Sequence, residues 1–119
     1  MPRITNSPAS RKRRKRRLKL ARGFYGARHR LFRTATEAVD HAMQYATIHR
    51  KHKKRSFRAL WIARLAAACR MHDISYSRFI EGVTKAGVTL NRKMLSEIAI
   101  HDPDGFAKLV ESVRGHAGS

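Results

Sequence analysis

Residues 10–33 read SRKRRKRRLKLARGFYGARHRLFR and hold the densest positive charge of the chain. Residues 11–17 are all basic, and no acidic residue interrupts the stretch. Like charges at this density repel one another, and the few apolar side chains cannot offset the entropy of ordering the segment. We therefore expect it to take a stable shape only against a polyanion, whose phosphates bind the cationic side chains as counterions are released.

The charge is spread unevenly over the chain. The 119 residues carry a formal net charge of +19, with a pI near 11.6. Residues 1–58 contain nineteen Lys and Arg against two acids, whereas residues 59–119 contain eight against six. A field of this strength attracts nucleic acid, an anionic membrane or an acidic protein. The sequence thus predicts two domains, a basic arm over 1–58 and a small globular domain over 59–119.

The arm shows helix signals on both sides of a bend. Residues 1–9 contain two prolines and predict an extended lead-in. Ser10 can cap a short helix that ends near Ala21, charged on nearly every face and stable only with a partner. Gly23 and Gly26 bracket an aromatic pair and predict a bend, with the rings either tucked onto the protein or near RNA.

A long helix is predicted after the bend. Thr34 and Glu37 form a capping box, and neither Gly nor Pro follows before Ile74. We expect one helix over 35–71, about 55 Å long. Because a domain this small needs far less for its core, the helix must project. Its middle, HRKHKKRSFR (49–58), is basic on every face, which suits phosphates on more than one side.

The remaining residues predict three short helices. Ser75, Asn91 and the Asp102-Pro103 pair are start signals, and Gly87 and Gly115 are stop signals. Apolar residues at helical spacing between these signals predict a small, marginal core. We expect its large aromatic members to be Trp61, Phe79 and Phe106. The predicted fold class is all-α, with a basic extended arm and a long projecting helix joined to a small globular bundle.

Catalytic, metal and membrane functions find little support in the sequence. No acid–base pair is visible, and Cys69 with His72 at i, i+3 lies on an apolar face where a buried thiol is expected. His49 and His52 share a helix face without a further ligand to complete a zinc site. A single cysteine and the lack of an apolar span favour a reducing, cytoplasmic setting. We predict no catalytic residue, metal, cofactor or small-molecule substrate, and no membrane partner.

Among polyanions, a folded RNA fits best. A membrane-surface helix would pair its basic face with a continuous apolar face, which the basic stretches lack. DNA-reading proteins present a compact reading helix or basic helices that fork from a zipper, and neither is evident. An arm that is disordered alone can thread between closely packed RNA helices. A nucleoid-type protein that compacts DNA remains the alternative from a different class.

Four segments resemble the bacterial large-subunit ribosomal protein L-twenty family. They are ARGFYGARHRLFRTATEAV (21–39), KKRSFRALWIARLAAACR (53–70), SYSRFIEGVTKAGVTLNRKMLSEIAIHDP (75–103) and FAKLVE (106–111). The resemblance implies a non-enzymatic protein of the ribosome that binds the large-subunit (23S) rRNA directly and organises it during assembly. It also implies neighbouring large-subunit ribosomal proteins as contacts and, for some members, repression of translation through binding to the protein's own mRNA.

The resemblance and the charge pattern together select the candidate rRNA-binding residues. Weaker candidates in the globular domain are Arg64, Arg78, Arg92 and Lys93, which could equally form a solvated face. The main candidates are the basic and aromatic residues of the arm and of the middle of the long helix: Arg11, Lys12, Arg13, Arg14, Lys15, Arg16, Arg17, Lys19, Arg22, Phe24, Tyr25, Arg28, His29, Arg30, Arg33, Arg50, Lys51, Lys53, Lys54, Arg55 and Arg58.

Overall fold

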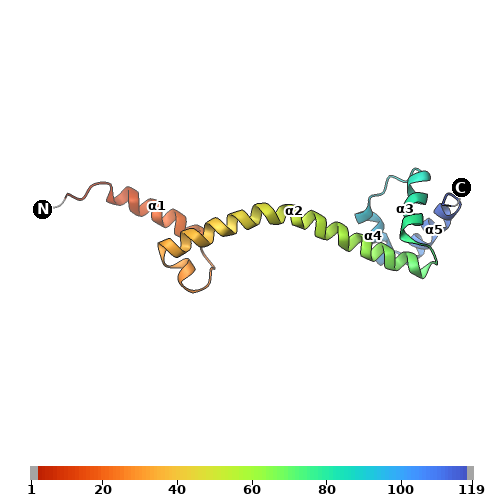
Figure 1. Ribbon diagram of the computed structural model, residues 1–119, viewed down its shortest axis with the longest axis horizontal. Helices are drawn as coiled ribbons and strands as arrows, with labels where there is room; N and C mark the ends of the chain where they lie inside the picture. The colour runs from red at the N-terminus through yellow and green to blue at the C-terminus, as the bar shows by residue number, and fades with distance from the viewer. Residues whose placement is uncertain (1–2, 118–119) are drawn as a thin grey trace. The chain divides into compact units, whose positions relative to one another are not determined.

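The computed structural model describes residues 3–117, and within that range every regular element is helical (Figure 1). The all-α prediction is therefore confirmed. The chain divides into two compact units, an N-terminal unit, Met1–Lys51, and a C-terminal unit, His52–Ser119. The long helix α2, Phe32–Met71, runs through the division, and the predicted domain boundary after residue 58 stays a prediction.

The first helix, α1, spans Ser7–Leu20 and begins three residues before the predicted start. Asn6 is its N-cap, with φ of 59° and no side-chain cap, and the amide of Ser10 donates to the Asn6 carbonyl oxygen at 2.9 Å. The prediction of Ser10 as the cap was wrong. Pro8 explains the earlier start, because proline is favoured in the first turn of a helix. The N–H that proline lacks would have no helical partner in that turn.

The bend at Gly23 and Gly26 is confirmed. Both glycines have positive φ, 86° and 61°, a conformation that glycine adopts without a Cβ clash. A short 3₁₀ helix, η1, follows at Gly26–His29, and the amide of Leu31 donates to the Ala27 carbonyl oxygen. The backbone thus bends at these glycines and enters α2 already partly helical.

The long helix is confirmed, but its predicted start was wrong. The helix α2 begins at Phe32, so Thr34 and Glu37 lie inside its first turns and form no capping box. The amide of Ala35 donates to the Leu31 carbonyl oxygen at 2.8 Å, which places the first helical hydrogen bond earlier than expected. The preceding 3₁₀ turn supplies this early nucleus. At 40 residues, α2 is about 60 Å long.

The N-terminal unit has a very small apolar cluster. Ala21, Ala35 and Val39 are buried, and Leu18 and Phe24 pack against them. These few small side chains remove little apolar surface from water, so hydrophobic stabilisation of this unit is weak. Helices α1 and α2 are also joined by an ion pair between the Arg17 guanidinium and the Asp40 carboxylate.

The C-terminal unit contains three further helices: α3, Tyr76–Lys85; α4, Arg92–His101; and α5, Pro103–Arg114. Their predicted caps are confirmed by side-chain acceptors. The Ser75 hydroxyl accepts from the Arg78 amide, the Asn91 side chain from the Met94 amide and the Asp102 carboxylate from the Gly105 amide. Helix α5 packs against α3 and α4 beside the C-terminal end of α2 (Figure 1).

Two helices of this unit end in the same left-handed turn. At the end of α3, Gly87 has φ of 68°, and the amide of Val88 donates to the Val83 carbonyl oxygen at 3.1 Å. The predicted stop at Gly87 is confirmed. At the end of α2, Asp73 takes the same role with φ of 52°, and the amide of Ile74 donates to the Cys69 carbonyl oxygen. In both turns a backbone amide donates a hydrogen bond to a carbonyl of the last helical turn, and an apolar residue, Val88 or Ile74, returns to the helix.

The core of the C-terminal unit forms around two phenylalanine rings. Phe79 and Phe106 are buried with ring centroids 5.3 Å apart, and Leu65 and Cys69 of α2 are buried in the same cluster. The prediction of Trp61 as a core residue was wrong, because it is only half-buried and lies outside this cluster. Trp61 precedes Leu65 by about one helical turn, and its ring contacts that of Phe57 instead.

Ser96 is the exception in this core, and its replacement should stabilise the protein. Among the buried side-chain nitrogen and oxygen atoms of residues 3–117, its hydroxyl oxygen is the one found without a hydrogen-bond partner. Ser96→Ala removes the unsatisfied hydroxyl and suits a helix better, so we expect about 1 kcal/mol of added stability in urea unfolding. Ser77→Ala on an exposed face of α3 is the control, with less than half that effect. A loss of stability in Ser96→Ala would mean that the hydroxyl has a partner.

Candidate nucleic-acid interface

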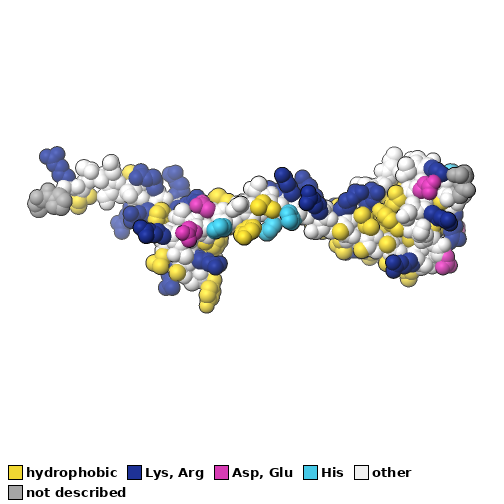
Figure 2. Space-filling view, in the orientation of Figure 1, with side chains coloured by type: hydrophobic (Ala, Val, Ile, Leu, Met, Phe, Trp, Pro, Cys, Tyr) yellow, Lys and Arg dark blue, Asp and Glu magenta, His cyan; other side chains and the backbone are white. Residues whose placement is uncertain are grey.

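The predicted cationic residues of α1 lie on the surface. Residues 11–17 occupy about two helical turns, so their side chains are distributed around the helix. Figure 2 shows Lys and Arg side chains along the face of α1 that is in view. All of them are exposed except Arg17, which is half-buried in its pair with Asp40. The guanidinium of Arg14 lies 5.7 Å from the centroid of the Phe32 ring, a cation–π contact. Nearly all of this charge therefore remains available to a partner.

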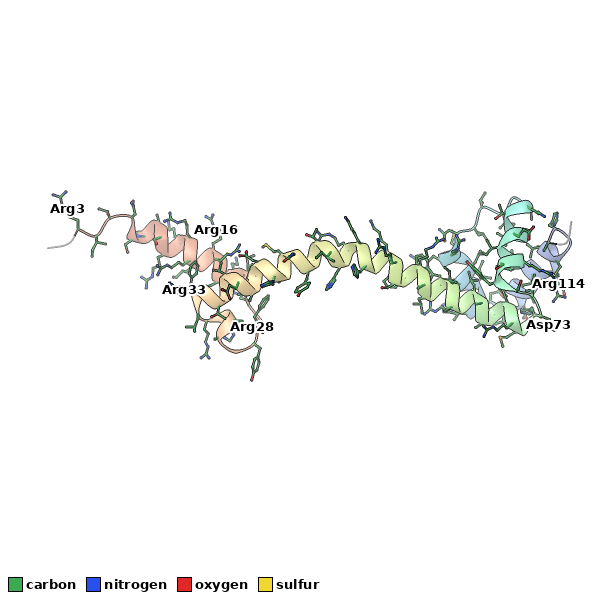
Figure 3. The ribbon with its side chains drawn as sticks, in the orientation of Figure 1. Arg3, Arg16, Arg28, Arg33, Asp73 and Arg114 are labelled. Carbon is green, nitrogen blue, oxygen red and sulfur yellow. The ribbon has the colours of Figure 1, made fainter. Side chains whose placement is uncertain are left out.

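The bend separates its two aromatic residues. Phe24 packs against the small apolar cluster, whereas the side chain of Tyr25 is 93% exposed. The Nδ1 of His29 lies 2.6 Å from the Phe24 carbonyl oxygen, so this ring donates a hydrogen bond that ties η1 to the bend. Among the predicted residues here, Phe24 and His29 have structural contacts, while Arg28 projects from η1 into solvent (Figure 3). Arg22, Arg30 and Arg33 are also exposed.

Every side chain from residue 40 to residue 60 is exposed. The stretch beyond Tyr45 holds the remaining candidates, all of them exposed: Arg50, Lys51, Lys53, Lys54, Arg55 and Arg58. Among the Lys and Arg side chains of residues 3–58, only Arg17 reaches a carboxylate. A run of uncovered, uncompensated cations this long needs counterions or an anionic partner.

Sequence reasoning missed a groove in the N-terminal unit. Its lining combines Phe24 and Arg28 with one face of α2 that includes Glu37 and Tyr45, and its volume is about 620 Å³. Tyr45 continues a row of rings, since the His49 ring stacks on it with centroids 5.4 Å apart. Ala38, Ala42 and Tyr45 recur at helical spacing, so the sequence contains a signal for this face of α2. The sequence contains no signal that the bend would return to this face.

The weaker candidates in the C-terminal unit have different surroundings. Arg64 lies 3.8 Å from Glu97, and the Nε of Arg92 donates to the Tyr76 hydroxyl at 2.9 Å. Arg78 and Lys93 are exposed. The neighbouring Lys85 hydrogen-bonds Glu81 and lowers the pKa of that carboxyl. This surface mixes both signs of charge and lacks the uncompensated field of residues 3–58.

Cys69 and His72 do not form a catalytic pair. The Cys69 thiol is fully buried, and burial raises its pKa from 9.0 to about 11, so it remains protonated at neutral pH. The His72 ring lies against Phe106, with centroids 5.8 Å apart. The part of the chain that the structure describes contains no group of three or more potential metal ligands. No helix between residues 3 and 117 is long and apolar enough to cross a membrane.

Alkaline pH should destabilise the C-terminal unit through Cys69. The folded thiol has a raised pKa, so its contribution to stability is complete below pH 9 and is lost as the pH rises towards 11. Between pH 8 and pH 10.5, the urea midpoint of unfolding should therefore fall further in the wild type than in Cys69→Ala. Equal falls in both proteins would assign the alkaline loss to other groups.

The sequence is similar to proteins of known family. Residues 3–109 match the family model described as ribosomal protein L20. The large ribosomal subunit protein bL20 of Opitutus terrae is 55% identical over 114 residues, which cover 96% of this chain and 90% of that protein. The bL20 protein of Xylella fastidiosa strain M23 is 53% identical, and the match covers 96% of each of the two chains. The bL20 protein of Thermoanaerobacter sp. strain X514 is also 53% identical, and that match covers 98% of each chain. The chain therefore belongs to the ribosomal protein L20 family.

Proposed function

We propose that this chain is a structural constituent of the large ribosomal subunit that binds 23S rRNA directly and organises it during assembly. Membership of a family of structural ribosomal proteins supports this role and excludes an enzyme. It also locates the protein in cytoplasmic ribosomes, with rRNA and neighbouring ribosomal proteins as partners. The charged surfaces of the chain support direct binding to rRNA.

The observation that carries the proposal is the uncovered, cationic middle of α2. A helix that is exposed at every position over residues 46–60 gains little from packing against its own protein. Its cations repel one another in the free chain, and phosphates on several sides would remove that repulsion. Closely packed rRNA helices provide phosphates in this arrangement.

The arm would act in the same way. The exposed cations of α1 and the arginines around the bend would neutralise phosphates of converging rRNA helices. Each neutralised phosphate releases counterions, and ten such contacts give a log–log salt slope of about −7 to −9. The protein would thus favour compact rRNA by screening repulsion between RNA helices that must approach one another.

Equilibrium binding of the full chain tests this proposal. We expect tighter binding to protein-free 23S rRNA than to duplex DNA of the same length at matched salt, with the steep salt dependence given above. A matched structured RNA of unrelated sequence shows how much of the affinity is non-specific. Equal or tighter binding to duplex DNA would contradict the proposal and favour DNA compaction.

A further inference from the structure

We infer that the groove beside the bend binds the base of a single unpaired guanine, an inference that rests on the proposed function and adds a specific contact to it. The groove lies wholly within the N-terminal unit, between the bend and one face of α2. Its volume of about 620 Å³ falls in the range of small-ligand sites. The size of the groove therefore permits a nucleotide.

The lining of the groove includes two small apolar side chains and two aromatic rings. Ala38 and Ala42 lie four residues apart on α2, and their small side chains leave room above the helix. Phe24 enters from the bend, where it is half-buried and held by the apolar cluster. Tyr45 adds a ring from the next turn of α2 and is 55% exposed. An unstacked base gains stacking energy on such rings.

Glu37 gives the groove its specificity. It is one of only two acids in residues 1–58, and the other, Asp40, pairs with Arg17. No cationic group of residues 3–117 lies within salt-bridge distance of Glu37. An exposed carboxylate on a phosphate-binding surface opposes phosphate binding, so its favourable partner must be a set of hydrogen-bond donors.

Guanine is the RNA base that presents such donors side by side. Its Watson–Crick edge carries N1–H and the N2 amino group, which together match the two oxygens of a carboxylate. Adenine and cytosine place a ring nitrogen acceptor beside their single amino group, and that acceptor would repel Glu37. Arg28, which also lines the groove, would pair with the phosphate of the same nucleotide. The four side chains Phe24, Arg28, Glu37 and Tyr45 thus form a complete base site.

Kethoxal probing of 23S rRNA in complex with the full chain tests this site, because kethoxal reacts at N1 and N2 of accessible guanines. We expect the wild-type protein to reduce the reactivity of one guanine about fivefold or more, as a bidentate contact would. Glu37→Gln should restore that guanine's reactivity and leave the other protected positions and the salt slope unchanged. Tyr45→Ala should raise reactivity at the same guanine. Glu111→Gln, at an exposed position of α5, changes the net charge equally and should change nothing.

The outcomes separate this inference from the proposed function. A Glu37→Gln footprint identical to that of the wild type would overturn the guanine site while rRNA binding stands. A change confined to adenines or cytosines, detected with dimethyl sulfate, would also overturn it. Failure of the wild-type protein to bind or protect the rRNA at all would instead contradict the proposed function.

Discussion

Reversing the charges of Arg13, Arg16 and Lys19 to Glu is expected to lower the affinity for 23S rRNA by about 100-fold or more. All three side chains are exposed on α1 and none pairs with an acid of residues 3–117. If these side chains contact phosphates as proposed, the reversal removes three such contacts and adds three repulsive charges. The log–log salt slope should fall in magnitude by about 2 to 3. Filter binding over a range of KCl concentrations measures both quantities.

A triple reversal in the C-terminal unit gives the matched control. Arg70, Lys85 and Lys108 are exposed there, and replacing them with Glu changes the net charge by the same amount. We expect this variant to lose much less affinity. Circular dichroism should show an unchanged urea transition of the C-terminal unit in the α1 variant. Equal losses of affinity in both triple variants would mean that overall charge, rather than α1, determines binding.

Phe106→Ala is expected to cost about 3–5 kcal/mol of stability, the largest effect of any single core substitution considered. Phe106 is buried, and its ring contacts both Phe79 and His72. The C-terminal unit of residues 52–117 buries a small core, so its total stability is of similar size. Urea unfolding followed by circular dichroism should therefore show a unit that is largely unfolded or close to its midpoint without denaturant.

Trp61→Ala is the control for the core substitution. Trp61 is half-buried on α2 outside the core cluster, so truncation should cost less than about 2 kcal/mol. A loss at Trp61 as large as that at Phe106 would place the tryptophan in the core after all. Unchanged stability in Phe106→Ala would contradict the description of the core itself.

The sequence predicts the local features of the fold well and the tertiary ones poorly. The caps at Ser75, Asn91 and Asp102 were confirmed because each signal acts within one helical turn. The starts of α1 and α2 were each predicted three residues late. A proline in the first turn and a 3₁₀ turn before the helix outweighed the Ser10 and Thr34 signals, which were equally suitable as caps.

The candidate site shows the same division. Exposure of the basic residues follows from charge alone and was predictable. The burial of Trp61 depends on where α3, α4 and α5 meet α2, and helical spacing does not contain that information. The groove was missed for the same reason, because it joins Phe24 to Glu37 and Tyr45 across a bend.

Amide hydrogen exchange of the full chain, without and with 23S rRNA, tests most directly whether the N-terminal half depends on RNA for its shape. Without RNA, we predict that amides of α1 and of residues 40–58 exchange as in an unfolded chain, while core amides of α3 and α5 are protected. With rRNA, the amides of α1 and of residues 40–58 should become strongly protected. Strong protection of α1 and residues 40–58 in the free protein at physiological salt would contradict this dependence.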